Sequence, residues 1–154
     1  VDVVDDSVAD RAAYHVGVAV SVVTALRSAA QRAARGDVFV PAELMMRYEV
    51  SSSVLFEPPK APEEMTEEYL ISKKGLRHAV EFMAGNARAH LMAASELQYQ
   101  VKKQAKPCFL PAVGPTMFLD ALEKVDYDIF HPSLSDAGRG LGLTLNLGRA
   151  WLTG

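Results

Sequence analysis

The sequence contains little cysteine, no long apolar run and no excess of positive charge. Cys108 is the single cysteine among 154 residues, which excludes an internal disulfide framework and a multi-cysteine metal centre. The net charge is −3, whereas a general nucleic-acid binder is normally basic. The longest apolar run, Val16 to Leu26, covers about half of the roughly 20 residues that span a bilayer. No Asn-x-Ser/Thr sequon occurs, so nothing in the sequence supports secretion.

Hydrophobic residues are abundant by contrast and make up 49% of the chain, with 23% charged residues. This balance favours one folded domain with a packed core over a disordered chain.

One long helix is predicted from Asp10 to Ala34, with Asp10 as its N-cap. Alternating valines between Val16 and Val22 suggest a strand instead, but no turn residue interrupts the segment before Gly36, which is a natural helix stop. Pro41 suits the first position of a short helix that ends at Arg47. The long helix would bury apolar residues at three- and four-residue spacing, namely Val16, Ala19, Val23, Leu26 and Ala30.

The middle of the chain predicts an irregular segment, 51–62, followed by a second long helix, 63–106. This helix would break or bend near Gly75 and Gly85 and end at Pro107. Glutamates at its start and lysines at its end would match the helix dipole. Its buried stripe would contain Tyr69, Leu76, Val80, Met83, Ala87, Leu91, Ala94, Leu97 and Val101.

The last part of the chain predicts a helix over 116–125, a break over 133–142 and an apolar tail, 141–152. The alternating leucines of the tail suit a strand, and their spacing also suits an amphipathic helix. Arg149 and Trp151 would suit a peripheral membrane contact, while docking against the other helices is the simpler alternative.

Residues 26–41 read L-R-S-A-A-Q-R-A-A-R-G-D-V-F-V-P. This segment resembles the second diphosphate-binding motif of the squalene/phytoene synthases, L-R-D-x-x-E-D-x-x-R-G-R-x-Y-L-P. The frame of the motif is kept, with Leu26, Arg27, Arg35, Gly36 and Pro41 in place. Its three acidic residues are replaced by Ser28, Gln31 and Arg32.

The resemblance implies that the acidic side chains of that family hold Mg²⁺ against a prenyl diphosphate, because hard cations prefer anionic oxygen ligands. The hydroxyl of Ser28, the amide of Gln31 and the guanidinium of Arg32 cannot take this role. We therefore expect a pseudoenzyme with no catalytic residue, no metal and no cofactor. The alternative is an active prenyltransferase whose metal site is completed by a missing N-terminal half.

Two further segments extend the resemblance over residues 10–134. His15 and Gly17 stand in a segment similar to the H-x-G-x-A helix of the superfamily. Residues 125–134 read V-D-Y-D-I-F-H-P-S-L, which is similar to the V-D-F-D-I-F-H-P-S-L signature of mitochondrial complex I assembly factors with a phytoene-synthase-like domain. Its characteristic residues are Asp126, Asp128, His131 and Pro132.

The resemblance implies an all-α, isoprenoid-synthase-type helical bundle of which this chain is the C-terminal portion. Residues 1–9 would be a connector, 10–134 the helical domain and 135–154 a tail. It further implies an assembly factor for respiratory complex I in the mitochondrial matrix or on the matrix face of the inner membrane. A component of another mitochondrial particle, such as the ribosome, is an alternative. A half-bundle leaves apolar faces uncovered, so protein partners are expected.

The other candidate sites favour structural roles. The four histidines lack metal-ligand spacing. Asp126, Asp128 and His131 could form a small acid/base or metal cluster, but a loop whose aspartates cap a helix or pair with arginine is favoured. Residues 138–142 lack the Lys-Ser/Thr ending of a P-loop and suit a linker. Cys108 is expected to be a buried packing residue and not a reactive thiol. Arg27 and Arg35 would bond backbone or acidic groups, with a residual prenyl or lipid phosphate site as the alternative.

Overall fold

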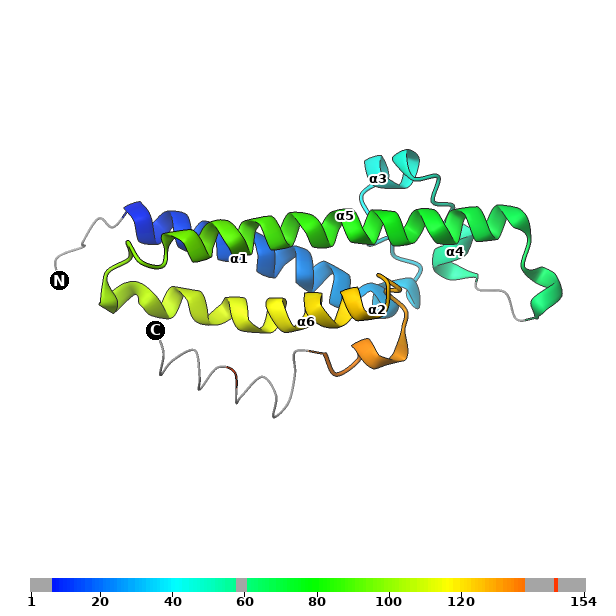
Figure 1. Cartoon of the computed structure of the whole chain (residues 1–154). Coiled ribbons are helices and arrows are strands. Elements are labelled where there is room, and N and C mark those ends of the chain that lie inside the picture. The colour runs from blue at the N-terminus through cyan, green and yellow to red at the C-terminus, as the bar shows by residue number, and fades with distance from the viewer. Residues whose placement is uncertain (1–6, 58–60, 138–145, 147–154) are drawn as a thin grey trace.

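Three long helices form the body of the molecule. The computed structural model describes residues 7–57, 61–137 and 146, and every regular element in this part of the chain is a helix. Helices α1 (Ser7–Arg27), α5 (Glu67–Leu97) and α6 (Val113–Lys124) contact one another, and the contact between α1 and α5 is the most extensive (Figure 1). The predicted all-α class is confirmed. The strand alternative near Val16 is wrong, because α1 buries residues at helical spacing, namely Ala12, Val16, Ala19, Val23 and Leu26.

The first helix is longer at its start and shorter at its end than predicted. It begins at Ser7, inside the expected connector, so Asp10 lies in the first turn and is not the N-cap. It breaks at Ser28, and α2 (Ala29–Ala33) follows. Ser28 has φ −82° and ψ 0°, and its hydroxyl donates to the Ala25 carbonyl at 2.9 Å. This local bond competes with the helical ladder, which explains why one continuous helix does not form.

Gly36 ends this helical region, as predicted. Its φ of +76° is a left-handed conformation that glycine adopts without penalty. The Asp37 N–H donates to the Arg32 carbonyl at 2.9 Å and the Gly36 N–H to the Ala33 carbonyl at 3.0 Å, a common helix-ending pattern. The short helix α3 (Ala42–Arg47) comes next, with Pro41 at its N-cap and not at its first helical position.

The segment predicted to be irregular contains the short helix α4 (Ser52–Phe56), and the 3₁₀ turn η1 (Pro62–Glu64) begins at its last residue. Val54 and Leu55 of α4 are buried in the core, and this burial stabilises a helical turn that the serine-rich sequence does not predict. The Ser51 N–H also donates to the Ser72 hydroxyl at 2.8 Å, which fixes the start of α4 against α5.

Helix α5 is uninterrupted, so the predicted break near Gly75 and Gly85 does not occur. It begins at Glu67 and not at Glu63, because the Thr66 hydroxyl accepts the Tyr69 N–H at 3.1 Å as an N-cap. The predicted stripe is buried at Leu76, Val80, Met83, Ala87, Ala94 and Leu97, while Tyr69 and Leu91 are partly buried.

The predicted end of α5 near Lys106 is also wrong. The helix ends at Leu97, and a 3₁₀ segment, η2 (Lys103–Ala112), contains Pro107. The lysines of this region therefore lie beyond the helix and not in its last turn. Between Leu97 and α6 only Val101 is buried, so this polar segment has no apolar stripe to stabilise a longer helix.

Helix α6 begins three residues earlier than predicted, with Pro115 at its third position, where no N–H is required. Arg88 of α5 pairs with Asp120 at 3.0 Å and with Glu123 at 2.7 Å, which ties α5 to α6. The 3₁₀ turn η3 (Pro132–Leu134) follows. Residues 138–142 and nearly all of the tail, for which a linker and a membrane contact were predicted, lie outside the described residues. No described helix is long and apolar enough to cross a membrane.

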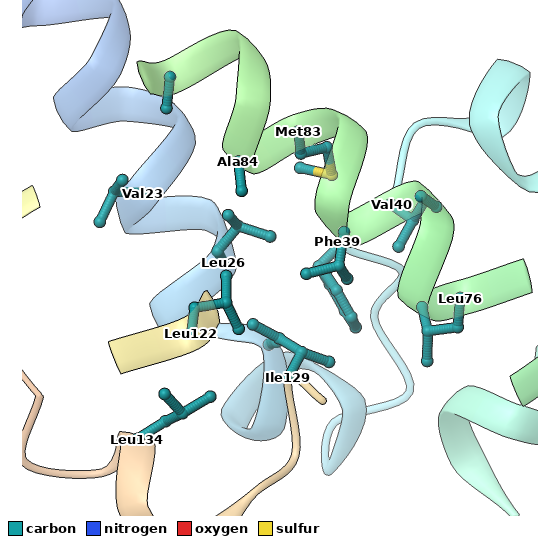
Figure 2. Packing of buried hydrophobic residues seen from close by; sticks show 14 of the residues in the cluster. Val23, Leu26, Phe39, Val40, Leu76, Met83, Ala84, Leu122, Ile129 and Leu134 are labelled. Atoms are coloured by element: carbon teal, nitrogen blue, oxygen red, sulfur yellow. The ribbon is translucent and has the colours of Figure 1, made fainter. Parts of the chain in front are cut away.

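The core lies where the three long helices meet the motif segment. Figure 2 shows Leu26, Met83 and Leu122 converging with Ile129 from the loop after α6 and Phe39 from the segment after α2. Two segments that carry the family resemblance are therefore built into the core. A second, smaller cluster at the other end of α1 contains Ala12, Leu97 and Val101.

Candidate functional site

The altered diphosphate motif spans the end of α1, the break at Ser28 and α2. Its first arginine, Arg27, points across the molecule toward α6. Its Nη2 donates to the carbonyl of Gly114 at 3.1 Å and to that of Ala137 at 3.0 Å. Its guanidinium also lies over the Phe118 ring, 5.1 Å from the centroid. This is the backbone bonding that the sequence predicts for Arg27, and it makes the side chain a brace between α1, α6 and the segment after η3.

The three residues that replace the acidic ligands do not converge on one point. The Ser28 hydroxyl is bonded to the backbone of its own helix. Gln31 is exposed, and Arg32 donates from Nη2 to the Val38 carbonyl at 2.7 Å, which holds the loop after α2. Arg35 is exposed at the end of the motif helix. Two of the replacements therefore take part in local hydrogen bonds.

A cavity of about 340 Å³ lies beside this motif. Its polar side chains are those of Arg27, Gln31, His131 and Ser135, and its walls are otherwise apolar. None of the described residues that line it is an aspartate or a glutamate. Because Mg²⁺ needs anionic oxygen ligands, the described part of this cavity does not provide a magnesium site.

A larger, half-open cavity of about 490 Å³ lies on another side of α2. Alanines of α2, the apolar residues of α4, one face of α5 and the loop 127–132 line it. Its charged side chains are those of Lys73, Arg77 and Asp128. The single carboxylate among them, Asp128, faces the Arg77 guanidinium at 3.8 Å. The chemistry of this lining suits an apolar group and not a metal ion.

The 125–134 signature forms the loop that separates these two cavities. Asp126 pairs with Arg77 at 2.6 Å, so Arg77 of α5 contacts both aspartates of the signature. Asp126 and Tyr127 have φ values of 52° and 55°, in the left-handed region that non-glycine residues seldom adopt. The Tyr127 N–H donates to the Leu122 carbonyl at 3.0 Å, which ends α6. The ion pairs thus hold a strained turn in place.

Two phenol groups of the larger cavity are held in their neutral form. Burial raises the pKa of Tyr69 above 10.0, and the nearby Asp128 carboxylate raises it further. Burial likewise raises the pKa of Tyr127, with further contributions from Glu123 and Glu81. Both phenol groups are uncharged at neutral pH, and the raised pKa values extend the neutral form to higher pH.

The acid/base cluster considered for Asp126, Asp128 and His131 is not assembled. His131 is the N-cap of η3, where its Nδ1 accepts the Ser133 N–H at 3.3 Å and lies 2.8 Å from the Ser133 hydroxyl. Pro132 starts the turn. The aspartates face Arg77 instead, which agrees with the predicted pairing with arginine. Among the described residues, no group of three or more His, Cys, Asp and Glu side chains could hold a metal ion.

His15 and Gly17 lie on α1, away from both cavities. Gly17 is exposed, and the His15 Nδ1 lies 2.9 Å from the Nδ1 of His90 on α5. Sequence reasoning missed His90 and Arg77 as partners. Helical periodicity could have placed each on its helix, but only the antiparallel register of α1 and α5 shows which residues meet. Cys108, expected to be buried, is half-buried near the smaller cluster.

Comparison with known proteins identifies the family of the chain. The squalene/phytoene synthase family model matches residues 1–140. The chain belongs to the squalene/phytoene synthase family. Within it, the chain is 33% identical over 150 residues to NADH dehydrogenase (ubiquinone) complex I, assembly factor 6, of Rattus norvegicus and of Homo sapiens. A Drosophila melanogaster homolog of that factor is 27% identical over 130 residues.

These alignments cover most of this chain and less than half of each relative. For the rat and human proteins they include 96% of this chain and 40% of the relative, and for the fly protein 84% and 36%. The chain therefore spans about two fifths of the length of the curated relatives that it matches. No solved structure gives a significant match.

Proposed function

We propose that this chain belongs to a non-catalytic protein that acts in mitochondria as an assembly factor for respiratory complex I. Two independent observations support this function. The relatives in rat, mouse, human and cattle carry that name and match nearly the whole chain. The segment that corresponds to the second diphosphate motif is used for internal bracing.

The main support for the absence of catalysis is the lining of the cavity beside the motif. An active synthase would need carboxylates there to hold Mg²⁺, whereas the described lining offers a guanidinium, an amide, an imidazole and a hydroxyl. The Arg27 Nη2 is engaged by two carbonyl groups, so using it to bind a diphosphate would remove a brace of the fold.

Exposed apolar side chains support a role in protein binding. Met46 on α3 is 75% exposed, and Phe82 and Met92 on α5 are 46% and 66% exposed. Contiguous apolar patches mark protein-binding surfaces, and these three side chains are candidates for such a patch. We place the protein in the matrix or on the matrix face of the inner membrane, where assembly partners for complex I would be met.

The catalytic part of the proposal is tested with the purified full-length protein. Farnesyl or geranylgeranyl diphosphate is added with Mg²⁺, and release of pyrophosphate is measured beside an active squalene or phytoene synthase. We expect release no faster than in a blank without protein. Mg²⁺-dependent release that scales with protein concentration would show that the scaffold is an enzyme.

The assembly part is tested by deleting the gene and separating mitochondrial complexes on native gels. We expect mature complex I to decrease and partial assemblies to accumulate, with recovery when the full-length gene is restored. Normal complex I together with a loss of assembled mitochondrial ribosomes would move the function to ribosome building and contradict the proposal.

A further inference from the structure

Two histidines that neither cavity includes meet between the two longest helices. His15 of α1 and His90 of α5 are 75 positions apart in the sequence, and their Nδ1 atoms lie 2.9 Å apart. The ring centroids are 5.0 Å apart, with 46° between the ring planes. Figure 1 shows α1 and α5 running next to each other, and this pair joins them. At this distance the Nδ1–H of one ring donates a hydrogen bond to the Nδ1 of the other ring.

The pair lies near the protein surface, next to an exposed tyrosine. Both histidines are half-buried, so solvent reaches the site. Tyr14, which is 64% exposed, contacts both imidazole rings edge-on, with centroid distances of 5.5 Å to His15 and 6.2 Å to His90. No third His, Cys, Asp or Glu of the described residues completes a metal-binding group here, so water would supply the other ligands.

We propose that His15 and His90 form a two-histidine binding site for a divalent transition-metal ion, with water in the remaining coordination positions. If the two nitrogens keep their 2.9 Å separation, they subtend an angle of about 90° at a metal ion that lies about 2.05 Å from each of them. This is the angle between neighbouring ligands in tetragonal Cu²⁺ and octahedral Ni²⁺ sites, whereas tetrahedral Zn²⁺ requires a wider one.

Binding requires only local rearrangement. Each Nδ1 must offer its lone pair to the ion, so the proton that joins the two rings moves to the Nε2 of its own ring through solvent. The rings then turn from facing each other to facing a common point. Because the ion binds the folded chain, where α1 and α5 are paired, it stabilises that state.

Titration of the purified full-length protein with Cu²⁺ tests the site, without a polyhistidine tag. We expect one ion per chain and an electron paramagnetic resonance spectrum with hyperfine coupling to two imidazole nitrogens. At a hundredfold excess of Cu²⁺ over the dissociation constant, the melting temperature rises by roughly 5 °C. His15→Gln and His90→Gln should each weaken binding by an order of magnitude or more and remove one nitrogen from the spectrum.

His78→Gln is the matched control, because His78 lies exposed on the same helix and contacts Tyr48 instead of the pair. It should leave the affinity and the spectrum unchanged. The glutamine variants keep a hydrogen-bonding group, and circular dichroism verifies that they fold. Absence of saturable binding to the unmodified chain would overturn the proposal. Tight binding that survives both His15→Gln and His90→Gln would overturn it too, because the ion would then lie elsewhere.

Discussion

Gly75 has no side chain, so the backbone at Tyr48 can cross α5 closely at this position. A Cβ added at Gly75 would lie 1.9 Å from the Tyr48 carbonyl oxygen and 3.0 Å from its carbonyl carbon. The atom that it meets belongs to the backbone, so no side-chain rotation relieves the clash. Gly75→Ala therefore forces the connection between α3 and α4 to withdraw by roughly 1 Å.

The cost can be worked out from the contacts that depend on this crossing. Overpacking of this kind costs about 1–3 kcal/mol. The hydrogen bond from the Ser51 N–H to the Ser72 hydroxyl lies next to the crossing, and its loss costs about 1 kcal/mol more. Alanine regains about 1 kcal/mol through its higher helix propensity. We expect Gly75→Ala to lower the free energy of unfolding by about 1–3 kcal/mol, because the last two contributions cancel.

Gly85→Ala is the matched control on the same helix. No atom lies within 4 Å of an added Cβ at Gly85, so only the propensity gain applies and the protein should become more stable by about 1 kcal/mol. Urea denaturation followed by circular dichroism measures both variants. Equal shifts for Gly75→Ala and Gly85→Ala, or no loss of stability in Gly75→Ala, would contradict a close backbone crossing at Gly75.

Two further predictions concern the site. Arg27→Ala removes two hydrogen bonds from a charged donor and should lower the free energy of unfolding by about 2–3 kcal/mol. Arg35→Ala, at an exposed position, should change it by less than about 0.5 kcal/mol. Equal losses of stability in urea denaturation would contradict the bracing role of Arg27. Because burial raises the pKa of Tyr69 and Tyr127 in the folded state, their contribution to stability is complete below pH 10 and is lost as the pH rises through the folded-state values. The Tyr69→Phe/Tyr127→Phe double variant should therefore lose stability less steeply in alkaline solution than the unmodified chain, with Tyr99→Phe, at a 94% exposed position, as the control.

The helical architecture could be predicted because apolar spacing and helix-ending residues act locally. The buried stripe of α1 and the stop at Gly36 both follow from such signals. The end of α5 could not be predicted this way, because Leu97 is followed by residues with reasonable helix propensity and no apolar stripe to bury. The short helix α4 was missed for the opposite reason, since its stability comes from the core around Val54.

The candidate site was only partly predictable. Loss of the acidic residues at Ser28, Gln31 and Arg32 is visible in the sequence, and so is the acidic loop after α6. The partner of that loop, Arg77, and the partner of His15, His90, come from a helix whose register against α1 and α6 no local pattern encodes. Long-range contacts between side chains require the packed structure.

We propose above that the full-length protein is a non-catalytic assembly factor for complex I. The most direct test is to tag the full-length protein in its own mitochondria, separate native complexes by size and identify the proteins in each fraction by mass spectrometry. We expect the protein to migrate with partial assemblies of complex I and to be absent from the mature complex. Migration as a free protein, with complex I assembly unaffected by its removal, would contradict this proposal.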